Sequence, residues 1–248
     1  MFFSFSVLFY VIVFVLCLEI TTFKEGWFLY LLFPLTLIMV PIFKKSSKQW
    51  LFSIPSISFS LAAFFMLYFV DFGITKQMFI FLSGLVLYLS LLGGYRLGKY
   101  AKDQTARGMV SASLMATVFF LYSAGYGAYL NFYVPIWTLM AFYFFVTFLL
   151  TLVYIRIINA VSKKKIEVMY SFLLGFSMME LAWVINFWPF GYLTTGVISL
   201  ILYYILWDFV QSYFLDILSK KRVVANSVFF VCIIIVILTT SRWMPNIY

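Results

Sequence analysis

Long apolar runs separated by short polar segments make up most of the chain. A membrane-spanning helix needs about 20 mostly apolar residues, within a range of about 17–25. Nine runs meet this requirement, and the segments between them are too short to hold a second folded unit. The pattern predicts an all-α fold, a polytopic transmembrane helix bundle in one integral membrane domain over residues 1–248. The runs are 2–20, 27–43, 50–70, 78–95, 109–130, 134–158, 166–186, 190–213 and 223–240.

Two of these runs contain a proline. Pro34 lies in run 27–43 and Pro55 in run 50–70, and we expect each proline to kink its helix rather than end it. Run 27–43 is also the shortest, so a re-entrant hairpin there is the alternative to a ninth span. The first run has no basic segment before it and no Ala-x-Ala-like site after it, which favours a spanning helix over a signal peptide.

Basic residues predict the orientation. With a cytoplasmic N-terminus, 14 of the 17 Lys and Arg residues fall in cytoplasmic segments and 3 on the opposite side. Omitting any one helix would scramble this asymmetry, so it supports nine spans with an external C-terminus. The cytoplasmic residues are Lys44, Lys45, Lys48, Arg96, Lys99, Lys102, Arg107, Arg156, Lys163, Lys164, Lys165, Lys220, Lys221 and Arg222, and the outer ones are Lys24, Lys76 and Arg242.

Composition supports the same class. Hydrophobic residues are 65% of the chain and charged residues 10%, whereas a soluble domain carries about 45–50% and 25%. The net charge of +9 would suggest nucleic acid in a soluble protein, but here it comes from loop clusters, so we expect no nucleic-acid partner. The partners expected instead are the bilayer, with anionic lipids at the cytoplasmic face, and other membrane subunits.

Residues for catalysis or metal binding are scarce. The chain has no histidine, which is the commonest metal ligand and general base, and Cys17 and Cys232 lie inside apolar runs. Phosphate-binding loops, nucleophile elbows and zinc-helix motifs are also missing. We therefore assign no catalytic residue and expect no cofactor or metal.

Ionisable residues inside a membrane are costly, so each one is a candidate for function. Glu19 lies near the outer end of the first run, within reach of Lys24, and is interpreted as a boundary residue. Arg156 and Asp208 lie at similar depths near the cytoplasmic ends of runs 134–158 and 190–213. They form a candidate structural ion pair.

Glu180 is the main functional candidate. It precedes the outer end of run 166–186 by six residues, which is about 9 Å at 1.5 Å per residue. Trp183 and Phe187 follow at helical spacing on the same face, and Asn186 closes the segment. A carboxyl group at this depth can be protonated, bind a cation or hydrogen-bond across helices, and the pattern leaves these three roles open.

Small residues mark one place where helices pack closely. Ala112 and Ala116 have the small-xxx-small spacing that lets two helix backbones approach each other. Gly84, Gly93 and Gly94 are the candidate partners in the preceding run. We expect this contact to be structural.

Three short stretches carry a resemblance. Glu180-Leu181-Ala182-Trp183, Phe187-Trp188-Pro189-Phe190-Gly191 and Tyr203-Tyr204 are similar to segments in a family of small, uncharacterised polytopic membrane proteins of candidate-phylum bacteria. The resemblance covers only the predicted seventh and eighth helices. It implies a bacterial cytoplasmic membrane and supports Glu180 as a notable position, but it implies no activity and no catalytic residues.

Three functions fit these observations. The leading hypothesis is a non-catalytic membrane subunit or scaffold, because the loops are minimal and catalytic motifs are missing. The first alternative is a small secondary transporter or channel that uses Glu180. The second is an intramembrane enzyme acting on a lipid or lipid-linked substrate, which would need acids and bases that this chain scarcely has.

The predicted topology can be tested with single cysteines. In intact cells, cysteines at Ser47, Thr105 and Ser162 should resist an impermeant thiol reagent, whereas cysteines at Thr75 and Asn246 should react, because the two sets lie on opposite sides. Labelling at both Ser47 and Thr75 would contradict the arrangement.

Overall fold

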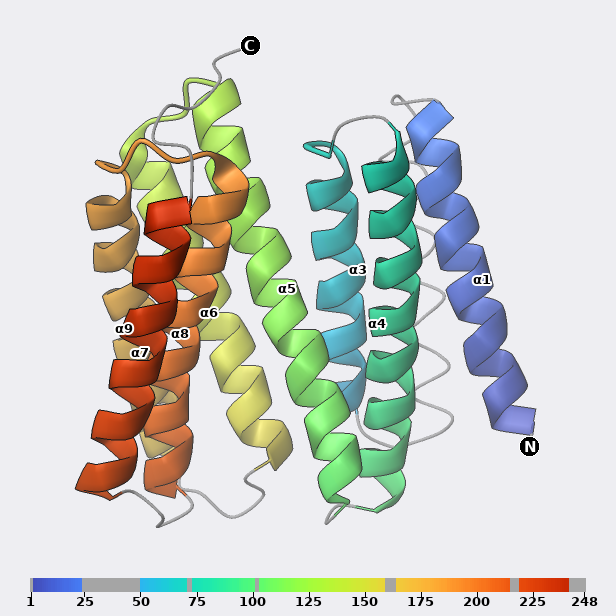
Figure 1. Ribbon diagram of the computed structural model, residues 1–248. Coiled ribbons are helices and arrows are strands. Elements are labelled where there is room, and N and C mark those ends of the chain that lie inside the picture. Colours follow the sequence, from blue (N-terminus) through green and yellow to red (C-terminus); the bar gives the residue numbers. More distant parts are fainter. Residues whose placement is uncertain are drawn as a thin grey trace. The chain divides into compact units, whose positions relative to one another are not determined.

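The computed structural model describes residues 2–23, 50–70, 73–100, 103–158, 164–214 and 219–240. These residues form helices and connecting turns, with no strand among them (Figure 1). This confirms the all-α prediction. The elements are α1 (Phe2–Phe23), η2 (Trp50–Ser53), α3 (Ile54–Leu67), α4 (Ile74–Lys99), α5 (Gln104–Asn131), α6 (Ile136–Ile158), α7 (Lys164–Ile185), α8 (Tyr192–Phe214) and α9 (Lys220–Thr240).

Six of the described helices, α4 to α9, are long and apolar enough to cross a membrane. The apolar helical stretches Val7–Thr22 and Leu51–Leu67 are shorter. Eight of the nine apolar runs coincide with described helices, whereas run 27–43 lies outside the described residues. The chain is therefore a helical membrane protein, as the composition indicated.

The chain divides into two compact units. Unit 1 comprises Met1–Phe120 and Val153–Ala160, and unit 2 comprises Leu121–Leu152 and Val161–Tyr248. Helices α5 and α6 each contribute one part to each unit. The single membrane domain over residues 1–248 stays a prediction.

The core of unit 1 is built from large apolar side chains. Phe14 of α1 meets Phe64 of α3 edge-on, with ring centroids 5.9 Å apart, and both rings are fully buried. A hydroxyl–hydroxyl hydrogen bond of 2.9 Å joins Ser56 of α3 to Ser90 of α4. These contacts place α3 beside α4, as Figure 1 shows.

Pro55 does not kink a long helix. It lies in the first turn of α3, immediately after the 3-10 turn Trp50–Ser53. A proline is favoured there because the first N–H groups of a helix have no intrahelical acceptor and the fixed φ suits helical geometry. Run 50–70 is therefore a short 3-10 turn followed by a helix that begins at Ile54. Pro34 lies outside the described residues.

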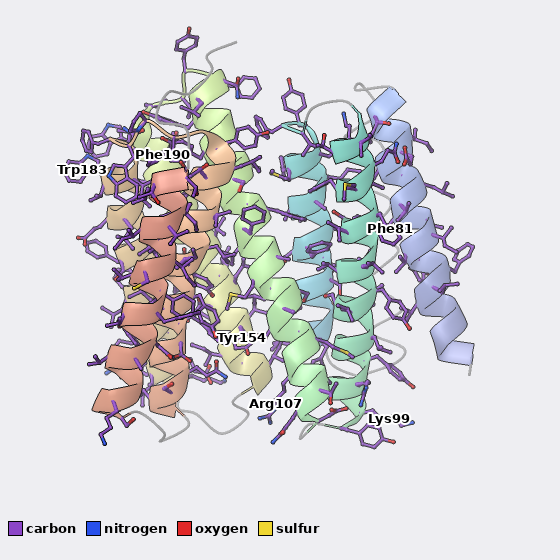
Figure 2. The ribbon with its side chains drawn as sticks, viewed as in Figure 1. Phe81, Lys99, Arg107, Tyr154, Trp183 and Phe190 are labelled. Carbon is purple, nitrogen blue, oxygen red and sulfur yellow. The ribbon has the colours of Figure 1, made fainter. Side chains whose placement is uncertain are left out.

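An ion pair between Arg96 and Asp103 connects the two ends of the hairpin between α4 and α5. Arg96 donates from Nε to Oδ2 of Asp103 at 2.9 Å, and its Nη2 lies 2.8 Å from the same oxygen. Asp103 also caps α5, because its Oδ1 accepts the Ala106 N–H at 3.2 Å. The Ala106 N–H and the Arg96 guanidinium both lower the pKa of Asp103, so the stability this carboxylate contributes is present at neutral pH and is lost as pH falls through the lowered pKa. In Figure 2, Lys99 and Arg107 lie near this end of the hairpin.

Small residues bring helices close at one predicted position, Gly93, but not at every position predicted. A Cβ on Gly93 of α4 would lie 2.9 Å from Met109 Cβ and 3.1 Å from the Ala106 carbonyl oxygen, so α4 and α5 touch one turn before Ala112. Gly84 packs instead against Val15 of α1. The prediction of a close α4–α5 contact is right for Gly93, whereas Ala112 is exposed.

Gly93→Ala should destabilise the protein by about 1–3 kcal/mol, because the added methyl group overpacks against α5. Gly108→Ala is the matched control, since a Cβ there meets nothing within 4 Å. The control should be neutral or stabilising by up to about 1 kcal/mol through helix propensity. Unfolding by sodium dodecyl sulfate in mixed micelles measures both, and equal stabilities for the two variants would contradict the close contact.

Candidate functional site

A closed set of hydrogen bonds joins α5 to α6 in unit 2. The Thr147 hydroxyl donates to the Tyr143 carbonyl oxygen at 2.5 Å, so its proton is used. The Tyr122 and Thr147 hydroxyls lie 2.6 Å apart, and Tyr122 must then be the donor of the hydrogen bond between them. The Tyr143 hydroxyl completes the loop by donating to the Tyr122 carbonyl oxygen at 3.2 Å. We name Tyr122, Tyr143 and Thr147 the tyrosine clamp.

Aromatic packing supports the clamp and extends it to α8. The Tyr122 and Tyr143 rings are stacked, with centroids 4.2 Å apart and planes 3° from parallel. Tyr203 of α8 meets Tyr122 edge-on at 6.5 Å. One turn beyond Thr147 on α6, Thr151 exchanges a 3.1 Å hydrogen bond with the Tyr203 hydroxyl. Three helices thus meet through buried tyrosines and threonines.

Smaller side chains fill the remaining contacts between α5 and α8. A Cβ on Gly196 would lie 1.9 Å from the Ser123 hydroxyl oxygen, so the backbone of α8 packs directly on Ser123 of α5. Thr195 lies beside the Tyr126 hydroxyl, and Ser199 beside that of Tyr143, at geometries short of a full hydrogen bond. The small residues Ser123 and Gly196 thus bring α5 and α8 into direct contact.

The chemistry of the clamp is that of a structural contact. All of its members are neutral hydroxyl-bearing side chains, and each clamp hydroxyl proton is donated to a neighbouring oxygen. The part of the chain that the structure describes holds no group of three or more His, Cys, Asp or Glu residues that could bind a metal ion. Buried, satisfied hydroxyl networks of this kind hold helices in register.

Glu180 lies elsewhere, on an exposed face of α7. Its side chain is exposed, and within the described residues no hydrogen bond or ion pair is formed by its carboxyl group. Trp183 and Phe187 lie on the same face, 49% and 68% exposed, with their rings edge-on at 5.3 Å. Figure 2 shows Trp183 at the outer edge of unit 2, near the end where Phe190 lies. The Trp183 and Phe187 rings thus contact each other as their spacing of four predicts, whereas the functional role of Glu180 stays a prediction.

An exposed carboxyl at this position is costly in lipid. Glu180 precedes Ile185, the last residue of α7, by five residues, or about 7.5 Å of helix. An ionisable side chain near the centre of a spanning helix costs about 2.5–3.5 kcal/mol on insertion scales, and less towards the interface. A protein partner that covered Glu180 and paired with it would remove this cost.

The other residues singled out in the sequence have the following surroundings. Asn186 is half-buried just after α7. Asp208 is buried on α8 and accepts a 2.8 Å hydrogen bond from the Asn226 amide of α9, a partner that the sequence did not suggest. Arg156 is exposed. The pairing of Arg156 with Asp208 stays a prediction, because these residues belong to different units.

Glu19 accepts a hydrogen bond from Gln77 at 3.3 Å, and Lys24 lies outside the described residues.

Two features escaped sequence reasoning. The clamp was missed because Tyr143, Thr147 and Thr151 are ordinary residues in an apolar run, and only their spacing of four shows that they share one face of a helix. Glu167, in the first turn of α7, is buried although the lysines just before it suggested a solvated loop. Its carboxylate is favoured there by the helix N-terminus.

Comparison with known proteins places this architecture in a family. The model of a family of proteins of unknown function, DUF5656, matches residues 43–240. The chain belongs to the DUF5656 family. The matched DUF5656 region contains the tyrosine clamp and the Glu180 face, whereas α1 lies before it. No curated protein and no solved structure matches the chain.

The clamp can be tested with a double-mutant cycle. Tyr122→Phe and Thr147→Val should each destabilise the protein, and the double variant should lose less than the sum, because both remove the same hydrogen bond. Interhelical polar contacts in membranes average about 0.6 kcal/mol and reach about 1.7, so we expect a coupling in that range. Tyr133→Phe, at a 98% exposed tyrosine, is the neutral control. Strict additivity would show that the two hydroxyls do not interact.

Proposed function

We propose that this DUF5656 chain is a non-catalytic subunit or scaffold of a protein complex in the bacterial cytoplasmic membrane. In this proposal it crosses the bilayer nine times, with its N-terminus in the cytoplasm and its C-terminus outside. The exposure of Glu180 on α7 is the observation that supports a subunit role. A carboxyl group on the outer face of a spanning helix is stabilised when another protein covers it.

The interior of unit 2 favours this function over the two alternatives. A transporter or channel that used Glu180 would place the carboxyl group on a polar path, whereas within unit 2 it lies on the face opposite the buried residues of α7. An enzyme would need an acid or base among its buried groups. Where α5, α6 and α8 meet, the hydroxyls of the tyrosine clamp, Thr151 and Tyr203 are already engaged in hydrogen bonds. Two buried acids of unit 2 lie elsewhere on its helices: Glu167 is in the first turn of α7, and Asp208 of α8 accepts the Asn226 amide of α9.

Purification from its native membrane tests the subunit role. When the full chain is tagged at its natural abundance and extracted into native nanodiscs, it should copurify with at least one other membrane protein in a fixed molar ratio, measured by quantitative mass spectrometry. A tagged, unrelated multi-pass protein of the same membrane controls for non-specific recovery.

Liposome assays test the transporter or channel alternative. The purified chain, reconstituted alone, should give no proton- or sodium-driven flux above protein-free liposomes. Flux from the chain alone, or recovery without a stoichiometric partner, would contradict the subunit proposal.

A further inference from the structure

One face of α7 has the pattern of a helix-pairing surface. Six exposed residues, the last of them just after the helix, recur at spacings of four, three, four, three and four, which is the heptad repeat of two helices that pack side by side. Val168, Phe172 and Val184 are also exposed and lie on the two flanks of this row. The apolar members are each 42–68% exposed. We name this surface the α7 seam, and its members are Met169, Leu173, Phe176, Glu180, Trp183 and Phe187.

The opposite face of α7 is already occupied within unit 2. Ser171, Leu174 and Met178 are buried there, and Gly175 packs on Phe144 and Phe148 of α6. Helix α7 therefore has one face that the fold buries and a second, regularly spaced face that the fold leaves exposed. An apolar face alone would suit lipid equally well, so the seam's occupant has to be identified from its one charged residue.

Glu180 identifies the chemistry of the occupant. It is the single ionisable residue of the seam, with Phe176 before it and Trp183 after it at heptad positions. A lone polar residue in such a repeat selects the partner and fixes the register, because a mismatched partner leaves it unpaired. A carboxylate is complemented by a cation, and a second copy of this chain would instead bring two carboxylates to the same depth.

We propose that the α7 seam binds a transmembrane helix of a different protein, and that this helix carries a Lys or Arg side chain opposite Glu180. The inference rests on the proposed subunit function and specifies the partner. The basic side chain lies about 7.5 Å inside the outer end of the span, at the depth of Glu180. The aromatic pair Trp183 and Phe187 forms the outer part of the contact and shields the ion pair from the headgroup region.

Photo-crosslinking in the native membrane tests the location. A photoreactive phenylalanine analogue replaces Phe176, Trp183 or Phe187 in the seam, and Phe145 or Leu149, which are exposed apolar residues of α6, as the matched control. The seam positions should crosslink to one partner, and peptide mass spectrometry should place the attachment sites on one helix that contains a Lys or Arg. The α6 positions should give lipid adducts only.

Charge variants test the chemistry. Glu180→Gln should lower the crosslink yield at Trp183 by about tenfold, because it strands the partner's cation, whereas Glu180→Asp should keep most of it. Lys164→Gln removes a charge from the same helix outside the seam and should have no effect. Replacing the partner's basic residue by Glu should abolish crosslinking, and combining that change with Glu180→Lys should restore it.

The outcomes separate this inference from the subunit function. Crosslinks from the seam to this chain itself, to a second copy or to lipid alone would overturn the inference, as would a yield unchanged by Glu180→Gln. If a stoichiometric partner still copurifies in those cases, the subunit function stands and only the seam assignment falls. If no partner copurifies, the subunit function itself falls.

Discussion

Tyr122, Tyr143 and Thr147 share three hydrogen bonds, two between α5 and α6 and one within α6, and in a bilayer no water competes for them. Each clamp hydroxyl proton is donated to an oxygen in this set, so breaking one contact strands a polar group in an apolar interior. The stacked tyrosine rings fix the same two helices in the same register. The Tyr203–Thr151 bond then sets the position of α8 on α6.

This way of holding the helices together determines where function can lie. Between helices in lipid there is little hydrophobic driving force, so packing and hydrogen bonds hold them in place. The clamp and the direct packing of Gly196 on Ser123 use the buried polar groups for that purpose. Glu180 is a different case, because it is a charged residue of the α7 seam and lies on the exposed face of α7.

Sequence reasoning worked where the bilayer itself sets the pattern. Run 166–186 corresponds to α7 (Lys164–Ile185), and run 223–240 to α9 (Lys220–Thr240), because hydrocarbon thickness fixes the length of an apolar span. The depth of Glu180 follows from the same argument. The direction in which a side chain points does not follow from the apolar pattern. Lipid and protein interior are equally apolar, so hydropathy cannot show which of the two a side chain faces. For this reason neither the burial of Tyr143 nor the exposure of Glu180 could be predicted.

At Pro55 and Asp208, too, the sequence pattern alone did not decide the local structure. A proline inside a long apolar run is compatible with a kink or with a helix start, and only the 3-10 turn before Ile54 decides between them. The sequence offered Arg156 as the partner of Asp208 at a similar depth, yet one hydrogen bond to Asp208 comes from the neutral amide of Asn226.

The central claim is that the buried hydroxyls of unit 2 stabilise the fold, whereas Glu180 recognises a partner. Its most direct test compares Tyr203→Phe with Glu180→Gln in the same native membrane, measuring for each the thermal stability of the chain and the partner recovered per folded molecule. The account predicts that Tyr203→Phe lowers stability but leaves recovery per folded molecule unchanged, and that Glu180→Gln does the reverse. Loss of partner recovery by Tyr203→Phe at unchanged stability, or loss of stability by Glu180→Gln with full recovery, would contradict it.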